Sequence, residues 1–390
     1  MRVTITLNQH MLTFGLWDLS PQLSRFTGEH ERMGADRMSQ AAKIARDRND
    51  QLKYGFEGNR VTRHTGSEYP IFQAPITGMA RSQLVSAISS AGGMGLMEAV
   101  RQTPEELQKE TEIVRSNTNR PFGYHLIPDF AYGTREKLDE TANWLLHNTR
   151  KPFMTMGYPG VTSGPDKLRF VKPFKEAGAI CYLVVDSIEE AMNAEDAGAD
   201  GLILSGGEAG GGRDPHGLHI FSLIQKVRQR TDLPLVASGG IADGIGMAGA
   251  FALGAEGILM GTRFMAANES PLHPNWKQEA VKAEQVYYLA YGRPAGGWLD
   301  KNKVVVAARN EFSDRVARGE IEPAGNPYFG DARACFYEGR TDLAMVGAGE
   351  SVVLFDKVQP VAEIIEQTIS EFWAEIDRLA NLARVRPEAS

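Results

Sequence analysis

Short apolar runs alternate with amphipathic segments eight times between residues 69 and 270. In the segments between the runs, apolar residues recur at three- and four-residue spacing, which is the period of a helix. Strands that alternate with helices of this length build βαβ units around a parallel sheet. Eight such units close a (β/α)8 barrel, and a doubly wound open sheet is the alternative architecture. The predicted strands are residues 71–74, 93–97, 122–126, 153–156, 180–184, 201–204, 235–237 and 257–260, and the predicted helices are residues 81–91, 104–116, 134–148, 165–176, 187–197, 220–230 and 243–253.

The chain is longer than a barrel requires. Its 390 residues exceed the roughly 250 of a bare (β/α)8 domain. We expect four parts: an N-terminal extension over 1–68, the barrel over 69–270, a helical cap or lid over 271–345, and a C-terminal segment over 346–390 that returns to the barrel. Within the extension, residues 29–52 are rich in Arg, Asp, Glu and Ala, and they predict a solvated helix.

Composition excludes several classes of protein. Hydrophobic residues make up 42% and charged residues 23% of the chain, as in a globular enzyme with a sizeable core. The net charge of −7 disfavours nucleic-acid binding, which needs a basic footprint. No apolar run approaches 18 residues, and the N-terminus lacks an apolar signal region, so we expect no membrane partner. Two cysteines give no disulfide framework and no metal site, which favours a cytoplasmic protein. The oligomeric state stays open, with a homodimer as one candidate.

Glycines follow the last two predicted strands. Gly239 and Gly240 end one run, and Gly261 and Thr262 end the next. In a (β/α)8 barrel, the turns after strands seven and eight commonly bind phosphate through backbone N–H groups and a helix N-terminus. Glycine suits such turns because it admits positive φ and lets the backbone approach a ligand. The alternative is two tight turns that bind nothing.

A longer glycine run, SGGEAGGG over residues 205–212, follows the sixth predicted strand. Such a run lets a flat ligand lie almost against the backbone. A flat ligand that also carries phosphate suggests FMN more than a sugar phosphate, bound at the carboxyl ends of the strands.

These motifs together resemble the nitronate monooxygenase family, formerly called 2-nitropropane dioxygenases, which includes flavin-dependent enoyl-acyl-carrier-protein reductases. The matching pieces are YPIFQAPITGMA, AGGMGLM, PFGYHL, GADGLILSGGEAGGG, LPLVASGGIADGIGMAGAFALGAEGILMGTRF and NESPLHPNWK, with a weaker echo at VGAGESVVL. The resemblance spans residues 69 to 277 and implies a barrel that holds FMN noncovalently.

Carried over position by position, the resemblance implies a set of FMN-binding residues. They are Ala74, Pro75, Ile76 and His125 around the flavin ring, Ala209 and Gly210 flanking it, and Gly239, Gly240, Gly261 and Thr262 at the phosphate. His125 stands where the family usually has an Asn, which changes the donor geometry and the charge options. The Thr262 hydroxyl would donate to phosphate, and its ordinary role as a helix N-cap is compatible with that.

The sequence departs from the family at Gly212. Family members commonly have GxEAGGH here, and that His is the usual acid or base near the reacting carbon, whereas this chain has GGEAGGG. Glycine transfers no proton. We take His216 and His125 as the candidate catalytic residues. The alternative for His216 is an ordinary surface turn, and for His219 it is the start of a helix.

The sequence therefore predicts an FMN-dependent oxidoreductase acting on a small molecule. It would oxidise alkyl nitronates with O2; a nitronate is already an anion, so the missing His matters less for it than for a neutral nitroalkane. The alternative within the family is an NAD(P)H-dependent reductase of an activated C=C bond, such as an enoyl thioester. Alternatives from other classes are a non-redox phosphate-binding barrel and a flavin-binding protein that has lost its chemistry.

Overall fold

A computed structural model describes residues 3–7, 10–14, 55–99, 102–127, 134–157, 168–214, 216–291, 303–321 and 331–384. The chain divides into two compact units, Met1–Lys53 and Tyr54–Ser390. In the first unit, strands β1 (Val3–Leu7) and β2 (His10–Phe14) form an antiparallel hairpin. The helix predicted over 29–52 lies outside the described residues.

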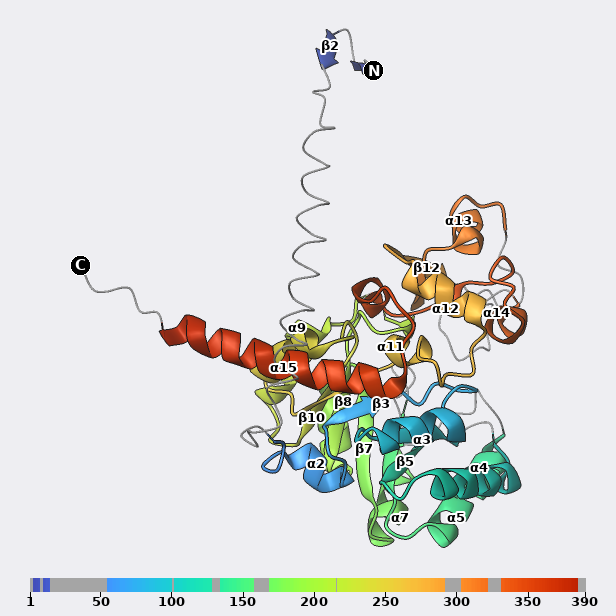
Figure 1. Cartoon of the computed structure of the whole chain (residues 1–390), viewed down its shortest axis with the longest axis vertical. Coiled ribbons are helices and arrows are strands. Elements are labelled where there is room, and N and C mark those ends of the chain that lie inside the picture. Colours follow the sequence, from blue (N-terminus) through green and yellow to red (C-terminus); the bar gives the residue numbers. More distant parts are fainter. Residues whose placement is uncertain are drawn as a thin grey trace, which may run out of the picture. The chain divides into compact units, whose positions relative to one another are not determined.

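The second unit contains the predicted barrel (Figure 1). Its parallel strands lie in the order β3-β11-β10-β8-β7-β6-β5-β4, and a bridge between Phe72 and Met94 closes the first strand onto the last. The (β/α)8 prediction is confirmed, and the predicted strands agree with the observed ones to within two residues at either end. The strands are β3 (Ile71–Gln73), β4 (Gly95–Glu98), β5 (Phe122–Leu126), β6 (Phe153–Met156), β7 (Ile180–Val185), β8 (Gly201–Ser205), β10 (Leu235–Ser238) and β11 (Gly257–Met260).

Helices follow the strands and cover the outside of the barrel (Figure 1). They begin where the sequence supplies caps: Thr103 and Glu106 form a capping box at one helix, and Asp243 accepts from the Gly246 N–H at another. The helices are α3 (Ser82–Ser90), α4 (Pro104–Asn117), α5 (Arg135–Asn148), α7 (Val171–Glu176), α8 (Ile188–Asp196), α9 (Ile220–Arg228) and α10 (Gly244–Ala252). None of the described helices is both long enough and apolar enough to cross a membrane.

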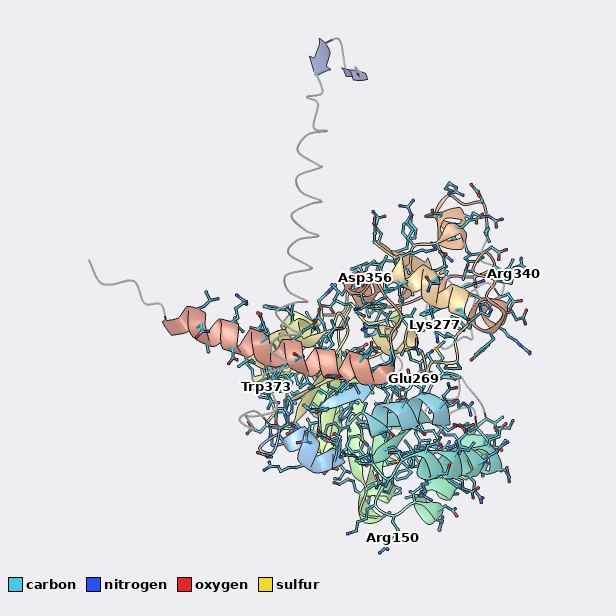
Figure 2. The ribbon with its side chains drawn as sticks, viewed as in Figure 1. Arg150, Glu269, Lys277, Arg340, Asp356 and Trp373 are labelled. Carbon is cyan, nitrogen blue, oxygen red and sulfur yellow. The ribbon has the colours of Figure 1, made fainter. Side chains whose placement is uncertain are left out.

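The C-terminal helix α15 (Val361–Arg384) packs along α10. Its Trp373, labelled in Figure 2, contacts the ring of Phe56 at 5.4 Å between centroids. The two helices approach so closely at Gly244 that a Cβ there would lie 2.2 Å from the Phe372 nitrogen and the Thr368 oxygen. Only glycine fits this crossing.

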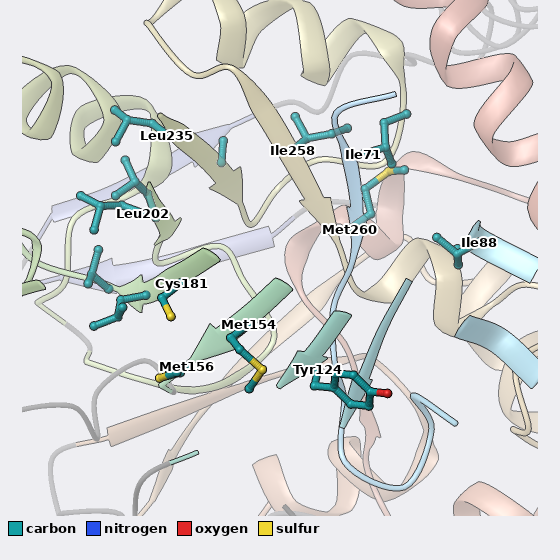
Figure 3. Packing of buried hydrophobic residues seen from close by; sticks show 14 of the residues in the cluster. Ile71, Ile88, Tyr124, Met154, Met156, Cys181, Leu202, Leu235, Ile258 and Met260 are labelled. Atoms are coloured by element: carbon teal, nitrogen blue, oxygen red, sulfur yellow. The ribbon is translucent and has the colours of Figure 1, made fainter. Parts of the chain in front are cut away.

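Alternation along the strands sorts the core into two layers. Outward-facing side chains pack beneath the helices, as Figure 3 shows for Ile71, Met154 and Met260. Inward-facing side chains fill the barrel, and Val61 of the short helix α2 (Arg60–Thr65) joins them. The inward set is Phe72, Met94, Leu96, Phe153, Tyr182, Ile203, Val236 and Leu259. The barrel is therefore a packed core over which a site is built at one end.

The region after β11 contains more than the helices we predicted for the cap. Besides α11 (Thr262–Met265), α12 (Pro274–Val281), α13 (Glu311–Ala317) and α14 (Ala332–Glu338), it forms an antiparallel sheet of β12 (Val286–Tyr291), β13 (Lys303–Ala308) and β14 (Val346–Gly347), followed by the 3-10 helix η3 (Glu350–Leu354). The fourth strand of this sheet, β9 (Gly211–Arg213), comes from the loop after β8. The Val and Tyr residues of 286–306 favour strands, so the cap is mixed rather than helical.

Candidate active site

Polar side chains form the last inward-facing layer at the carboxyl ends of the strands. Glu98, His125, Thr155, Ser205 and Ser238 are all buried there, above the apolar filling of the barrel. Glu98 lies opposite His125 in the strand register, and His125 lies opposite Thr155. Glu98, His125 and Thr155 make hydrogen bonds within the protein, and the layer is suited to recognise a polar ligand from below.

The His125 imidazole is held neutral. Its Nδ1 lies 2.9 Å from the Thr155 hydroxyl oxygen, and the side chain is 3% exposed. Burial lowers the pKa of His125 to about 3, and a hydrogen bond with Thr155 offsets this in small part. At neutral pH the ring therefore offers hydrogen bonds but not a positive charge.

Glu98 is the acidic residue of this layer and is fully buried. The Arg81 guanidinium lies 2.9 Å from its carboxylate, and the Gly78 N–H donates to the same oxygen at 3.4 Å. The pair joins the end of β4 to the loop after β3, which contains Ala74, Pro75 and Ile76. These three residues are half-buried, so the loop borders the mouth of the barrel.

Gln73 ends β3, and the sequence placed it at a strand end without assigning it a role. Its side chain accepts from the Leu96 N–H at 3.2 Å and donates to the Ala74 carbonyl. It thereby fixes the start of the loop. The sequence signal that could have assigned Gln73 a role is its position as a lone polar residue at the end of an apolar run.

The glycine turns after β10 and β11 form a cradle of backbone donors. Gly239 and Gly240 have φ of 107° and 68°, a region that favours glycine. A Cβ on Gly239 would lie 2.9 Å from the Ala209 nitrogen, so the two loops touch. Within the described chain, the N–H groups of Gly239, Gly240 and Gly261 donate to no backbone carbonyl. Unpaired amides beside the first turn of a helix fit an anion.

The C-terminal segment completes this cradle. The Gly349 N–H donates to the Thr262 hydroxyl oxygen at 2.9 Å, which leaves the hydroxyl hydrogen free to donate to a ligand. Gly349 also packs on the glycine loop after β8, where a Cβ on Gly349 would lie 2.7 Å from the Gly210 nitrogen. We did not assign Gly349 from the sequence, although the VGAGESVVL echo contains it.

Arg213 braces the glycine loop after β8. Its guanidinium is buried and donates to the carbonyls of Ala209 and Gly210 at 3.0 and 2.7 Å. A fixed loop keeps the two predicted flavin neighbours in place. Among the described residues, no cluster of three or more His, Cys, Asp or Glu side chains is arranged to hold a metal ion.

We compared the chain with known protein families and solved structures. The family model of nitronate monooxygenase matches residues 59–371, which is most of the chain. The chain belongs to the nitronate monooxygenase family. The match identifies it as an oxidoreductase, and it confirms the resemblance drawn from the motifs.

The chain is similar over most of its length to relatives with different names. A nitronate monooxygenase of Pseudomonas aeruginosa is 28% identical, over 80% of this chain and 99% of the relative. A (3aS,4S,5R,7aS)-5-hydroxy-7a-methyl-1-oxo-octahydro-1H-indene-4-carboxyl-CoA dehydrogenase of Rhodococcus jostii is 25% identical, over 83% of this chain and 98% of the relative. The structure of FabK from Thermotoga maritima is similar with a TM-score of 0.71 and 31% identity, over 83% of this chain and 99% of that one.

FMN, the cofactor that the nitronate monooxygenase family implies, fits the residues present. The amides of Gly239, Gly240 and Gly261, which donate to no backbone carbonyl of the described residues, and the Thr262 hydroxyl suit a phosphate dianion. The polar layer with His125 suits the hydrogen-bonding edge of a flavin ring. Adding a Cβ to Gly261 would bring it to 3.3 Å from the Ala74 Cβ and 3.6 Å from the Ile76 Cδ1, so glycine keeps this part of the cradle open.

The position of the family His is occupied by backbone here. Gly212 lies in β9, in register with Val305 of β13, so this chain supplies no acid or base at that point. The structure does not bring His216 into the buried layer. Its side chain is exposed, and the backbone N–H of His216 donates to the Asp214 carboxylate at 2.9 Å. His219 is also exposed and precedes α9, with its Nδ1 3.4 Å from Glu208.

Proposed function

We propose that this protein is an FMN-dependent oxidoreductase that oxidises alkyl nitronates with O2. The observation that carries the proposal is the absence of a proton-transferring side chain at Gly212, within a site that otherwise keeps the family's glycine cradle. A nitronate has already lost its proton, so its oxidation needs no base. A neutral nitroalkane needs one. The family match favours this redox chemistry over a non-redox phosphate-binding barrel.

The roles of the residues follow from the geometry. FMN, when bound, supplies a two-electron acceptor that is reoxidised by O2. Gly239, Gly240 and Gly261 hold its phosphate with Thr262, and Ala209 and Gly210 flank the ring. His125 positions the ring edge through a neutral imidazole. We retain His216 as a candidate for proton transfer from the surface loop, where His216→Ala should lower turnover of a neutral nitroalkane and leave FMN bound.

Oxygen consumption tests the choice of substrate. The FMN-loaded enzyme should consume O2 with 2-propyl nitronate at least about tenfold faster than with neutral 2-nitropropane at equal concentration, since only the second substrate needs a base. A matched comparison uses freshly dissolved nitroalkane, so that little nitronate has formed. Equal rates, with His216→Ala slowing only the nitroalkane, would mean that a surface base replaces the family His. No consumption with either substrate would reject the proposal.

The second candidate is reduction of an activated C=C bond in a thioester by NAD(P)H. It is favoured by the similarity to FabK, whose identity exceeds that of the nitronate monooxygenase relatives, and by the CoA-thioester dehydrogenase among the relatives. The test is anaerobic addition of NADH or NADPH to the FMN-loaded enzyme. Rapid bleaching followed by reoxidation with an enoyl thioester would establish this activity.

Two further expectations stay proposals. We place the protein in the cytoplasm, supported by two free and buried cysteines, Cys181 and Cys335. Burial raises the pKa of each thiol to about 12, so neither is poised for redox exchange. A homodimer is one candidate assembly, and analytical ultracentrifugation at several concentrations would test it.

A further inference from the structure

A second cavity lies at the end of the barrel where the strands begin, away from the flavin site. It has a volume of about 180 Å³. Its walls come from α2, from the ends of α4 and α5, and from the starts of β5, β6 and β7. Arg150, labelled in Figure 2, lies beside it at the lower end of the barrel, opposite the cap.

The lining of this cavity is basic. His64, Arg115, Arg150 and Lys151 line it, and among the residues that the structure describes no carboxylate does. Burial lowers the pKa of His64, whose Nδ1 is hydrogen-bonded to the Tyr182 hydroxyl at 3.0 Å, so the ring is neutral near pH 7. The other three side chains are cations. Within the described ranges, none of them makes an ion pair with an acidic residue. In a chain of net charge −7, three exposed cationic side chains that line one cavity form a local positive field that attracts anions.

The backbone at this cavity is unusual as well. Lys151 has φ of 44°, and within the described chain it is the one non-glycine residue with positive φ. The left-handed conformation is unfavourable for a side chain with a Cβ, and such outliers gather at ligand sites. Glycine would relieve the strain at no steric cost, yet the chain has a lysine there.

Cations near helix C-termini also interact favourably with the helix dipole. That role accounts for Arg115 in the last turn of α4. It does not account for three cations that line one cavity, nor for a strained lysine among them. A binding role accounts for both.

We propose that this cavity binds a phosphate group, held by Arg115, Arg150 and Lys151. Guanidinium groups match phosphate oxygens with paired donors, and the lysine adds a point charge. The volume is below the range of pockets that enclose drug-sized ligands, so the cavity takes free phosphate or the phosphate end of a small metabolite rather than a whole nucleotide. The site is separate from the phosphate cradle at Gly239 and Gly261, on the opposite end of the strands.

Calorimetric titration of the FMN-loaded protein tests the proposal, because bound FMN fills the cradle at the mouth. Sodium phosphate, pyrophosphate and AMP are the probes, at ionic strength matched with NaCl. Phosphate should bind with one site per chain, and Arg150→Glu should weaken it at least about tenfold. Lys109→Glu, an exposed change on α4 outside the cavity, should alter the affinity by less than about twofold. If AMP binds at least about tenfold tighter than phosphate, the source is a phosphorylated metabolite, and equal affinities indicate the free anion.

Lys151→Gly separates binding from folding. This substitution removes a cation and relieves the left-handed strain, so it should weaken phosphate binding without lowering the melting temperature. Equal phosphate affinity in the wild type, Arg150→Glu and Lys151→Gly would overturn the proposal. So would absence of binding to the FMN-loaded wild type, or an equal loss of affinity in Lys109→Glu, which would indicate a general surface-charge effect.

Discussion

At the scale of single residues, Gly261 decides whether the cradle holds a phosphate. Gly261→Asp would place a carboxylate beside the FMN phosphate, and two like charges side by side in a partly buried site repel strongly. We expect this variant to purify with less than about a tenth of the wild-type flavin. Absorbance of the flavin per protein measures the outcome. Gly261→Ala is the control, since its Cβ at 3.3 Å from Ala74 needs only a small adjustment.

His125 makes a separate prediction about pH. Its pKa is lowered to about 3 in the folded state and is about 6.5 in the unfolded chain. The unfolded state therefore binds more protons between these values, and the contribution of His125 to stability is complete above about pH 6.5 and is lost as pH falls toward 3. Acidification from about pH 7 to pH 5 should lower the free energy of unfolding by up to about 2 kcal/mol through His125.

Urea unfolding at both pH values measures this effect. His125→Asn, which restores the residue usual in the family, should lose correspondingly less stability on acidification than the wild type. An identical pH dependence of the two proteins would show that His125 is not buried as a neutral imidazole.

The residue scale also shows the limit of prediction from sequence. The glycine turns at the strand ends were predictable. The phosphate cradle needs a backbone with positive φ, and the glycines at 239 and 240 indicate that conformation in the sequence. Gln73, Glu98 and Gly349 were not, since their roles depend on which loops the barrel brings together. We predicted His216 as a site residue because it lies close to Gly212 in the sequence. The structure shows that its side chain is exposed.

At the scale of elements, the crossing of α10 and α15 predicts opposite effects on stability for alanine substitutions at two glycines of α10. Gly244→Ala would force its Cβ into the backbone of α15, and we expect a loss of stability of roughly 1–3 kcal/mol or more. Gly249 lies on the exposed face of α10 with no atom within 4 Å of an added Cβ. Gly249→Ala should stabilise the protein by about 0.5–1 kcal/mol. Urea unfolding of both variants checks this; equal effects would refute the close crossing.

Elements differ in how far the sequence determines them. The eight barrel strands were predictable because each is a buried apolar run between glycines and helix caps, and local signals agree with the fold. Strand β9 was missed because three residues of a glycine loop become a strand only by pairing with β13 far along the chain. Such pairing depends on tertiary contact rather than on local propensity.

At the scale of the whole molecule, the barrel separates two kinds of chemistry. The carboxyl ends of the strands hold the polar layer and the glycine cradle, while the opposite end holds the basic cavity. The apolar filling between them carries stability, so variants at either end should affect ligand binding more than folding. Double variants that combine Gly261→Asp and Arg150→Glu should show additive effects on the two ligands. Coupling beyond about 0.5 kcal/mol would mean that the two ends communicate.

The most direct test of the proposed function is an anaerobic visible spectrum of the FMN-loaded protein during titration with 2-propyl nitronate. The flavin band should bleach with one equivalent of nitronate per flavin and return when O2 is admitted. NAD(P)H should leave it unchanged. Bleaching by NAD(P)H alone would contradict nitronate oxidation and assign the enzyme to the reductase branch. A protein that binds no flavin even after incubation with FMN would contradict the cradle itself.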